Sequence, residues 1–118
     1  MDKPHKKLDA WRTSIDMADK IYRLTSGFPV DEKFGLVAQM RRAAVSVPSN
    51  IAEGAARTSS AEFRHFVSIA RGSLSELDTQ LDICVRLNFS DAESREAFDP
   101  LLNRIDRLLY GLHKSLRN

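Results

Sequence analysis

Apolar residues recur at steps of three and four along almost the whole chain, the spacing that places side chains on one face of a helix. No segment shows the period-two alternation of a half-buried strand. Four segments carry the helical spacing, at about residues 8–26, 34–57, 60–88 and 90–118. Because short connections make consecutive helices antiparallel neighbours, the pattern predicts an all-α, up-down-up-down four-helix bundle. We expect one domain over residues 1–118, with a frayed polar segment at 1–7.

The first predicted helix has two adjacent apolar stripes, so its apolar face is wider than contact with one neighbouring helix requires. One stripe comprises Leu8, Trp11, Ile15, Ala18, Tyr22 and Thr25, and the other comprises Met17, Ile21, Leu24 and Phe28. The additional apolar surface is predicted to lie either in the bundle core or in a contact between subunits. Gly27 ends this helix, and Pro29 prevents its continuation.

The second predicted helix contains a proline in its interior. Its buried face is predicted to comprise Phe34, Val37, Met40, Ala44, Val47 and Ile51. Pro48 has no N–H for the carbonyl of Ala44, so the helix either ends near Val47 and restarts, or continues with a kink. In the second case a neighbouring polar side chain would bind the freed carbonyl. The candidates are Ser46, Ser49 and Asn50. The unbroken apolar spacing from Val47 to Ile51 favours the kinked helix.

Capping residues predict where the later helices begin. Asp31 is a suitable N-cap for the second helix. Ser59 with Glu62 has the spacing of a capping box at the start of the third helix, and Ser90 with Glu93 has it at the start of the fourth.

The third and fourth helices are predicted to bury leucine-rich seams. The third seam comprises Phe63, Val67, Ala70, Leu74, Leu77, Leu81 and Cys84, and the fourth comprises Leu102, Ile105, Leu109, Leu112 and Leu116. Glycine inside a helix costs about 1 kcal/mol relative to alanine. Gly72 therefore predicts a close approach to a neighbouring backbone, with Ala52 and Gly54 as candidates opposite it. Pro100 either lies in the first turn of a new helix that follows a short one, or kinks a single helix.

A specific signature lies in the second and third helices. It comprises Gln39-x-Arg41-Arg42-Ala43-Ala44-x-Ser46-x-Pro48-Ser49-Asn50-Ile51-Ala52-Glu53-Gly54, then Glu62-Phe63 and Gly72-Ser73-Leu74-x-Glu76-Leu77-x-Thr79-Gln80-Leu81. Further matches upstream are Trp11, Ile21-Tyr22, Phe28-Pro29 and Phe34-Gly35-Leu36, whereas over 90–118 only the leucine spacing matches. These residues resemble the 23S rRNA intervening-sequence proteins, a family of four-helix bundles whose biochemical activity is poorly defined.

The resemblance implies an assembly and partners that the residue pattern alone does not. Relatives of this family form ring-shaped pentamers, so it implies a homo-oligomer, with a pentamer as the expected state. Related accessory proteins of diversity-generating retroelements bind nucleic acid and a reverse transcriptase. The implied partners are therefore RNA or DNA, and a protein such as a reverse transcriptase. A ring would gather several copies of a basic surface and multiply a weak affinity for phosphate.

The composition indicates the cellular compartment in which the protein is expected. The chain has 118 residues and a formal net charge of only +2, so bulk charge selects no partner. Cys84 is the only cysteine, which excludes an intrachain disulfide and fits a reducing cytoplasm. No apolar run has the length of a membrane span, and none follows the N-terminal lysines as in a signal peptide. We expect a cytoplasmic protein that does not bind membranes.

Candidate chemistry is sparse. Glu62-x-x-His65 resembles one half of a di-iron site in helix bundles, which needs a second copy and two more carboxylates. The sequence has no second copy, so we expect an exposed Glu–His pair and no metal or other cofactor. Cys84 lies on an apolar seam and is expected to be a core residue. The sequence therefore predicts no catalytic residues and a protein that is not an enzyme.

A file of polar residues follows the second helix beside its apolar face. The file comprises Arg42, Ser46, Asn50 and Glu53, and the third helix offers Glu76, Thr79 and Gln80. One hypothesis is a buried polar network that sets the register of the two helices, with an Arg42–Glu76 ion pair across the interface. The other is a ligand or catalytic pocket. The network is favoured because it accounts for polar residues around Pro48.

Charge is distributed unevenly between the two ends of the predicted bundle. One end gathers Lys3, Lys6, Lys7, Arg57, Arg64, Lys114 and Arg117 against the acids Asp2, Asp9, Glu53 and Glu62. The other gathers Asp31, Glu32, Asp82, Asp91, Glu93 and Glu96 against the bases Lys33, Arg86 and Arg95. Helix dipoles favour acids at helix N-termini, so they do not account for Lys6, Lys7 and Arg64. Arg57, Arg64 and Arg71 also recur every seven residues as a stripe.

Two functions fit this pattern. A non-enzymatic oligomer would bind the nucleic-acid backbone through a basic end that contains Lys6, Lys7, Arg57, Arg64, Arg71 and Lys114. Alternatively the charges are solvated, and the protein is a protein–protein scaffold or accessory subunit without a nucleic-acid role. The stripe has no interleaved aromatic residues, so sequence-specific reading of single strands is not expected.

Overall fold

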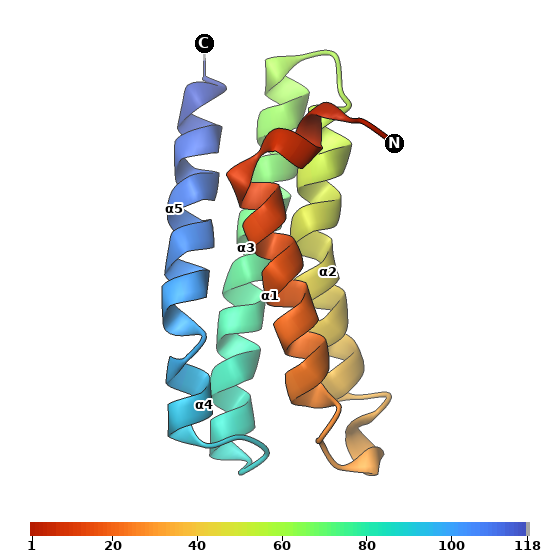
Figure 1. Ribbon diagram of the computed structural model, residues 1–118, viewed down its shortest axis with the longest axis vertical. Coiled ribbons are helices and arrows are strands. Elements are labelled where there is room, and N and C mark those ends of the chain that lie inside the picture. Colours follow the sequence, from red (N-terminus) through yellow and green to blue (C-terminus); the bar gives the residue numbers. More distant parts are fainter. Residues whose placement is uncertain (118) are drawn as a thin grey trace.

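The computed structural model describes residues 1–117, which form four antiparallel helical rods and no strand. The elements are η1 (Pro4–Lys7), α1 (Asp9–Thr25), η2 (Val30–Glu32), α2 (Leu36–Ala55), α3 (Ser60–Arg86), α4 (Ala92–Glu96) and α5 (Asp99–Ser115). Here η1 and η2 are short 3₁₀ helices, and α4 with α5 makes the fourth rod (Figure 1). The predicted all-α antiparallel bundle is confirmed. Its η1 lies within the segment that was expected to be frayed.

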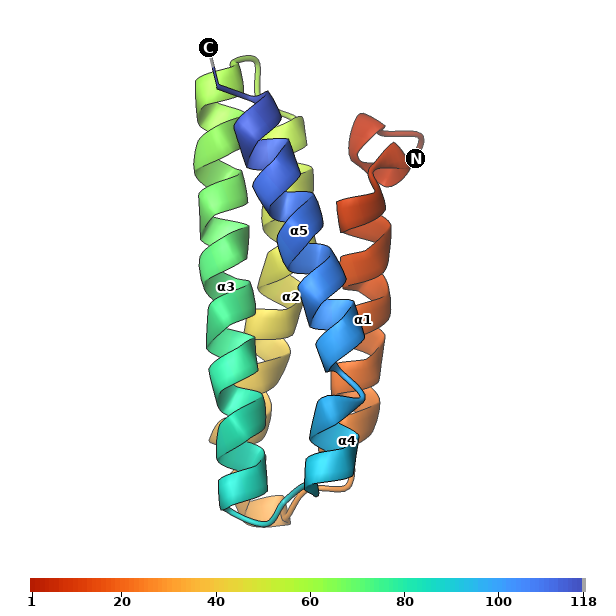
Figure 2. The ribbon, with the colours of Figure 1, turned by 90° about the vertical axis from the view of Figure 1, so that its left-hand side faces the viewer.

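Successive rods are joined at alternate ends of an elongated body that measures 45 × 24 × 21 Å. Both chain termini and the α2–α3 turn lie at one end, which we call the terminal end (Figures 1 and 2). The α1–α2 and α3–α4 connections lie at the other, the distal end. This arrangement brings together the helix ends that the sequence predicted to form a basic end.

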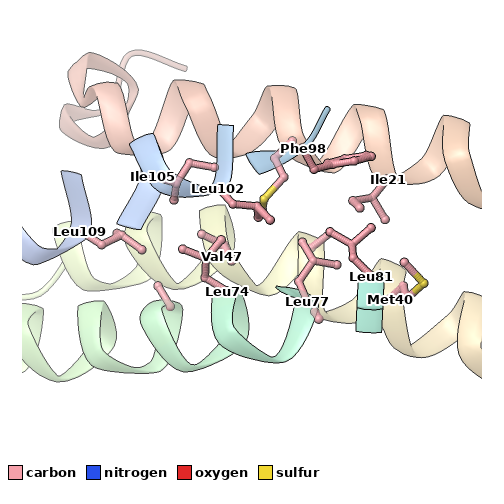
Figure 3. Packing of buried hydrophobic residues seen from close by; sticks show 14 of the residues in the cluster. Ile21, Met40, Val47, Leu74, Leu77, Leu81, Phe98, Leu102, Ile105 and Leu109 are labelled. Atoms are coloured by element: carbon pink, nitrogen blue, oxygen red, sulfur yellow. The ribbon is translucent and has the colours of Figure 1, made fainter. Parts of the chain in front are cut away.

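The core runs along the axis between the four rods (Figure 3). The predicted seams are confirmed: Met40, Val47, Ile51, Val67, Leu77, Leu81, Ile105 and Leu109 are almost completely buried. Of the two stripes of α1, the second forms the core through Met17 and Ile21, whereas Ile15 and Tyr22 of the first are partly exposed. Phe34 was predicted to be in the core, but it is 89% exposed. The reason is that α2 begins two residues later, so Phe34 lies in the preceding turn.

The helix α2 continues through Pro48 without interruption, so the alternative of a break near Val47 is wrong. Pro48 is itself buried in the core. Asn50 was one of the polar residues expected to bind the carbonyl of Ala44, which Pro48 leaves without an N–H. Its Nδ2 donates instead to the carbonyl oxygen of Ser46, at 2.8 Å. In contrast, α4 and α5 are separate helices, and Pro100 occupies the first turn of α5, where a missing N–H costs nothing.

The glycine at the close approach is Gly54, not Gly72. A methyl group at Gly54 would lie 2.8 Å from Cβ of Phe66 and 2.9 Å from Cδ1 of Phe63, so α2 and α3 meet here without room for a side chain. Gly72 is exposed, and a methyl group there would meet nothing within 4 Å. The prediction for Gly72 was therefore wrong, because Gly72 lies two residues from both Ala70 and Leu74, on the side of α3 away from the buried seam.

One of the three predicted caps is confirmed. Oγ of Ser59 accepts from the N–H of Glu62 at the start of α3, at 3.1 Å. Asp31 lies in η2 instead of capping α2, whose first N–H, at Leu36, is bound by the carboxylate of Glu32 at 3.2 Å. The residue that caps α4 is Asp91, not Ser90. Its carboxylate accepts from the N–H of Ser94 at 2.7 Å.

The C-terminus of α3 is closed by Asn88 in a left-handed conformation, with φ of 62°. The N–H of Phe89 then reaches back to the carbonyl of Cys84 at 2.9 Å, and the N–H of Asn88 to that of Val85 at 3.0 Å. These are the two hydrogen bonds of a Schellman motif, and asparagine is among the few residues that tolerate this conformation. The reversal places Phe89 5.6 Å from Phe28, between ring centroids, at the distal end.

Candidate nucleic-acid interface

The polar file of α2 contributes one contact across the α2–α3 interface. Oγ of Ser46 and Oγ of Ser73 are 2.8 Å apart, and Nδ2 of Asn50 donates to both the hydroxyl and the carbonyl of Ser46. Small hydroxyl side chains suit this position because the two helices pack closely. This group forms the centre of the hypothesised register-setting network, with Ser73 as a partner that the sequence did not single out.

The remaining residues of that file are not joined to this centre. Arg42 and Glu76 are both exposed, and within residues 1–117 they form no ion pair, contrary to the expected one. Glu76 instead accepts from Nε2 of Gln80 at 3.3 Å, within α3. Gln80 is only 4% exposed, and its Oε1 has no hydrogen-bond partner among the described residues.

A shallow groove of about 490 Å³ lies between α1 and α2. It is lined by Tyr22, Ala38, Arg41, Arg42, Val45, Ser46, Ser49 and Asn50. Glu53 does not line it, because its carboxylate binds Arg57 of the following turn at 3.1 Å. The two residues that would suggest a catalytic pocket in this region, Asn50 and Glu53, are therefore not brought together.

The other chemical candidates are separated in space. Burial raises the pKa of Cys84 to about 11, and its thiol lies 3.4 Å from the sulfur of Met40 in the core. Glu62 and His65 lie beside a surface groove with Arg57 and Phe66. Within residues 1–117, no three His, Cys, Asp or Glu side chains are grouped as ligands for a metal ion. No helix in this range is long and apolar enough to cross a bilayer.

The lysines of the terminal end are solvated. Lys6 and Lys7 lie in η1 and are exposed, and the ammonium group of Lys6 donates to the carbonyl of Met1. Lys114 is exposed in the last turn of α5. None of the three forms an ion pair within residues 1–117. Their charge is therefore available to an external anion.

The three arginines predicted to form one stripe are divided between two surfaces. Arg57 precedes the first turn of α3, so it does not continue the helical repeat. Its guanidinium lies 4.8 Å from the ring centroid of Phe66 and pairs with Glu53. Arg64 and Arg71 instead face α5. Arg64 donates to the carbonyl of Leu116 at 3.1 Å, and Arg71 lies over the ring of Tyr110 at 5.5 Å.

The position of Arg64 has a structural reason that its own helix does not supply. A cation near the N-terminus of α3 opposes the dipole of that helix, but the same cation reaches the C-terminus of α5, where Leu116 is the C-cap. Arg64 thus donates to a carbonyl at the end of α5, and this carbonyl lies beside Arg64 only in the folded bundle. Arg64 and Arg71 form a basic seam with His113 of α5 and with Arg117, which follows the C-cap of that helix.

The pKa of His113 reflects the positive charge of this seam. Partial burial lowers the pKa of His113 below its ordinary value, and the positive charges of Arg117, Arg71 and Arg64 lower it further. All three charged neighbours that affect it are cations. These cations favour the neutral form of the imidazole and produce a field that would attract an anion.

Two arginines that bind helices together were not recognised in the sequence. Arg41 of α2 lies over the ring of Tyr22 at 4.4 Å and donates to Oγ1 of Thr25 of α1 at 2.9 Å. Arg95 of α4 pairs with Asp78, Asp82 and Asp99, so it ties α4 to α3 and α5. No spacing rule indicates the contacts of Arg41 with Thr25 or of Arg95 with Asp78 and Asp82, because they join residues 13 to 17 positions apart on different helices.

The fold and this surface define a small antiparallel helical bundle with a cationic end. The family model described as "23S rRNA-intervening sequence protein" matches residues 6–111. The chain therefore belongs to the 23S rRNA-intervening sequence protein family.

A solved structure shows the same fold. It is the crystal structure of a protein of unknown function from the S23 ribosomal protein family of Bacteroides thetaiotaomicron, with 23% sequence identity and a TM-score of 0.79. The similarity covers 89% of this chain and 98% of that one. No curated protein matches the chain.

Proposed function

We propose that this protein is a non-enzymatic homo-oligomer that binds the backbone of RNA or DNA through its terminal end. The observation that carries the proposal is the set of cations there without carboxylate partners within residues 1–117. Of the four acids expected at that end, Asp9 pairs with Arg12 and Glu53 with Arg57, and the other two are Asp2 and Glu62. Lys6, Lys7 and Lys114 are exposed and are left to interact with an external anion. The name of the family, which refers to 23S rRNA, supports RNA as the ligand to test first.

Self-association is supported by a different surface. Partly exposed apolar side chains flank α2 on both sides and are contributed by α1, α2 and α3. They are Ile15, Tyr22, Val45, Ile69 and Ile83. An assembly that buries this face would leave the terminal ends of several copies free to bind one polyanion, which multiplies a weak affinity. A pentamer is the state that the family resemblance implies.

The test of nucleic-acid binding uses variants that leave the fold intact. A labelled single-stranded RNA is titrated with the protein at several salt concentrations, and fluorescence anisotropy is measured. Replacing Lys6, Lys7 and Lys114 together with Gln should reduce the salt slope by about 2, because each phosphate contact to a single strand contributes roughly 0.7. The control replaces Lys20, Lys33 and Arg86, which carry the same charge away from the terminal end. Absence of binding at low salt would exclude the proposal and favour a protein–protein scaffold.

The test of self-association is light scattering after size-exclusion chromatography. Val45→Lys should reduce the molar mass of the parent assembly toward that of a monomer. Val30→Lys, in the exposed turn before α2, serves as the control and should leave the mass unchanged. A parent protein that is monomeric at all concentrations would exclude the homo-oligomer.

A further inference from the structure

We propose that the basic seam of Arg64, Arg71, His113 and Arg117 binds a phosphate group of the nucleic-acid backbone, and that His113 takes up a proton when the phosphate is bound. This inference rests on the proposed function, which it makes more specific. It assigns a particular site between α3 and α5, which lie side by side at the terminal end (Figure 2). It also adds a dependence on pH that scattered lysines would not produce.

The two arginines of α3 are held in place by α5. Arg64 is anchored by its hydrogen bond to the carbonyl of Leu116, and a guanidinium has five N–H donors, so this bond leaves others for a ligand. Arg71 is held over the ring of Tyr110. Neither arginine has a carboxylate partner within residues 1–117. Their planar groups are thus positioned before a ligand arrives, which lowers the entropy lost on binding.

His113 is the group whose charge can change. It is partly buried in the last turn of α5, and the charges that act on it are Arg117, which lies just beyond this helix, and Arg64 and Arg71 of α3. Asp78 of α3 and Asp106 of α5 lie outside the basic seam, because they line a different groove between these helices, further toward the distal end. None of the three charged groups within residues 1–117 that shift the pKa of His113 is negative, and a bound phosphate would place a negative charge among them.

The sign of the pH effect follows from this arrangement. In the free protein, burial and the three cations hold the pKa of His113 below its ordinary value. A bound phosphate favours the imidazolium form, so the pKa of His113 is higher in the complex than in the free protein. Binding is then coupled to proton uptake and strengthens as pH falls through the pKa of the complex. A rise of about one pKa unit corresponds to about a tenfold gain in affinity.

The experiment measures binding of labelled oligo(U) from pH 8 to pH 6 at constant ionic strength, because uracil does not titrate in this range. The parent should bind several-fold tighter at pH 6 than at pH 8, because the full gain is reached only below the pKa of His113 in the free protein. His113→Gln should remove this dependence on pH. His5→Gln and His65→Gln, which replace the other two histidines, should retain the dependence. His113→Lys should bind at pH 8 as tightly as the parent does at pH 6.

Arg71 provides an independent test of the site. Arg71→Gln should weaken binding about tenfold by removing one guanidinium from the phosphate, whereas Arg71→Lys should retain part of it and Arg86→Gln should change it little. Circular dichroism and size-exclusion chromatography verify that each variant is folded and assembled. NMR titration of the imidazole should show a higher pKa of His113 with oligo(U) than without it.

The outcomes separate this inference from the proposed function. If the parent binds no oligo(U) at low salt at any pH, the proposed function fails. If the parent binds but His113→Gln keeps the same pH dependence, or Arg71→Gln binds as the parent does, nucleic acid is bound elsewhere and this site is wrong. If inorganic phosphate at low millimolar concentration competes as well as RNA does, the seam is a site for free phosphate, which overturns its assignment to the backbone.

Discussion

The two ends of the bundle use arginine in opposite ways. At the distal end, Arg95 is only 12% exposed and is surrounded by the carboxylates of Asp78, Asp82 and Asp99. Desolvation lowers the pKa of Arg95, but the hydrogen bonds and charges of Asp82 and Asp78 outweigh it, so the pKa lies above its ordinary value. At the terminal end, Arg64 and Arg71 meet a backbone carbonyl and an aromatic ring.

The difference separates structural arginines from those that can serve a ligand. A guanidinium whose charge is matched by carboxylates contributes to stability and has little attraction left for an external anion. A guanidinium held by a carbonyl or a ring keeps its net charge. The distal end is therefore closed by ion pairs, whereas the terminal end is positioned by neutral contacts and retains a positive field. Four substitutions test this contrast, from the largest expected effect to the smallest.

Gly54→Ala should have the largest effect, because the terminal end depends on the close approach of α2 and α3. The added methyl group would lie 2.8 Å from Cβ of Phe66, which is too near the backbone to move easily. We expect a loss of about 3 kcal/mol in the free energy of unfolding, measured by urea denaturation. Gly72→Ala is the matched control and should be neutral or stabilise by up to about 1 kcal/mol. Equal effects at both glycines would contradict the assignment of the close approach.

Arg95→Ala should remove the cross-link of the distal end. The three aspartates would lose their common partner, and α4 would lose its attachment to α3. Because these aspartates are more than half exposed, solvent screens part of the loss, and we expect about 2 kcal/mol in urea denaturation. Arg86→Ala, at an exposed position near the end of α3, should cost much less. Nucleic-acid binding by Arg95→Ala should equal that of the parent, and a large loss of binding would break the contrast between the ends.

Arg64→Gln should reveal the structural part of the role that this residue has at the terminal end. Loss of its charged hydrogen bond to the C-terminus of α5 is expected to cost about 1 kcal/mol in thermal or urea unfolding. Lys114→Gln removes the same charge from the same end but no described contact, so its stability should be close to that of the parent. A Lys114 variant as unstable as the Arg64 variant would show that the carbonyl contact is unimportant.

Asp91→Ala should have the smallest effect, and that effect should depend on pH. The N–H and hydroxyl of Ser94 hold the pKa of Asp91 below its ordinary value of 3.8. A carboxylate with a lowered pKa in the folded state stabilises the protein above its ordinary pKa, and this contribution disappears as pH falls through the lower value. The melting temperature of the variant should be slightly below that of the parent at pH 7, and the two should converge below pH 3.8. A constant difference would exclude an electrostatic cap.

Most of the fold follows from the sequence, because burial of a helical face imposes a spacing that can be read directly. The seams of α3 and α5, the uninterrupted course of α2 through Pro48 and the Ser59 cap all depend on neighbours within one or two turns. Several errors concern positions near helix ends, whereas the errors at Gly72 and at the Arg42–Glu76 pair concern contacts between helices. Phe34 satisfies the apolar spacing of α2, but the helix begins at Leu36, and no local signal showed that Gly35 would be its N-cap.

The candidate interface was predictable in outline and not in detail. The alternating topology placed Lys6, Lys7, Arg64 and Lys114 at one end, since consecutive helices reverse direction. It did not show that Arg57 would bind Glu53 or that Arg64 would bind the end of α5. His113 was not singled out at all.

The chain's own pattern of apolar residues determined that there would be four antiparallel rods and which face of each rod would be buried, because these properties depend on spacing along one helix. Only the tertiary structure decided which glycine lies at the close approach, which serine meets Ser46, and which arginines are neutralised. Those outcomes depend on the rotation and height of each helix relative to its neighbours. Residues such as Arg64 and Leu116, separated by 52 positions, have no fixed relationship until the helices pack.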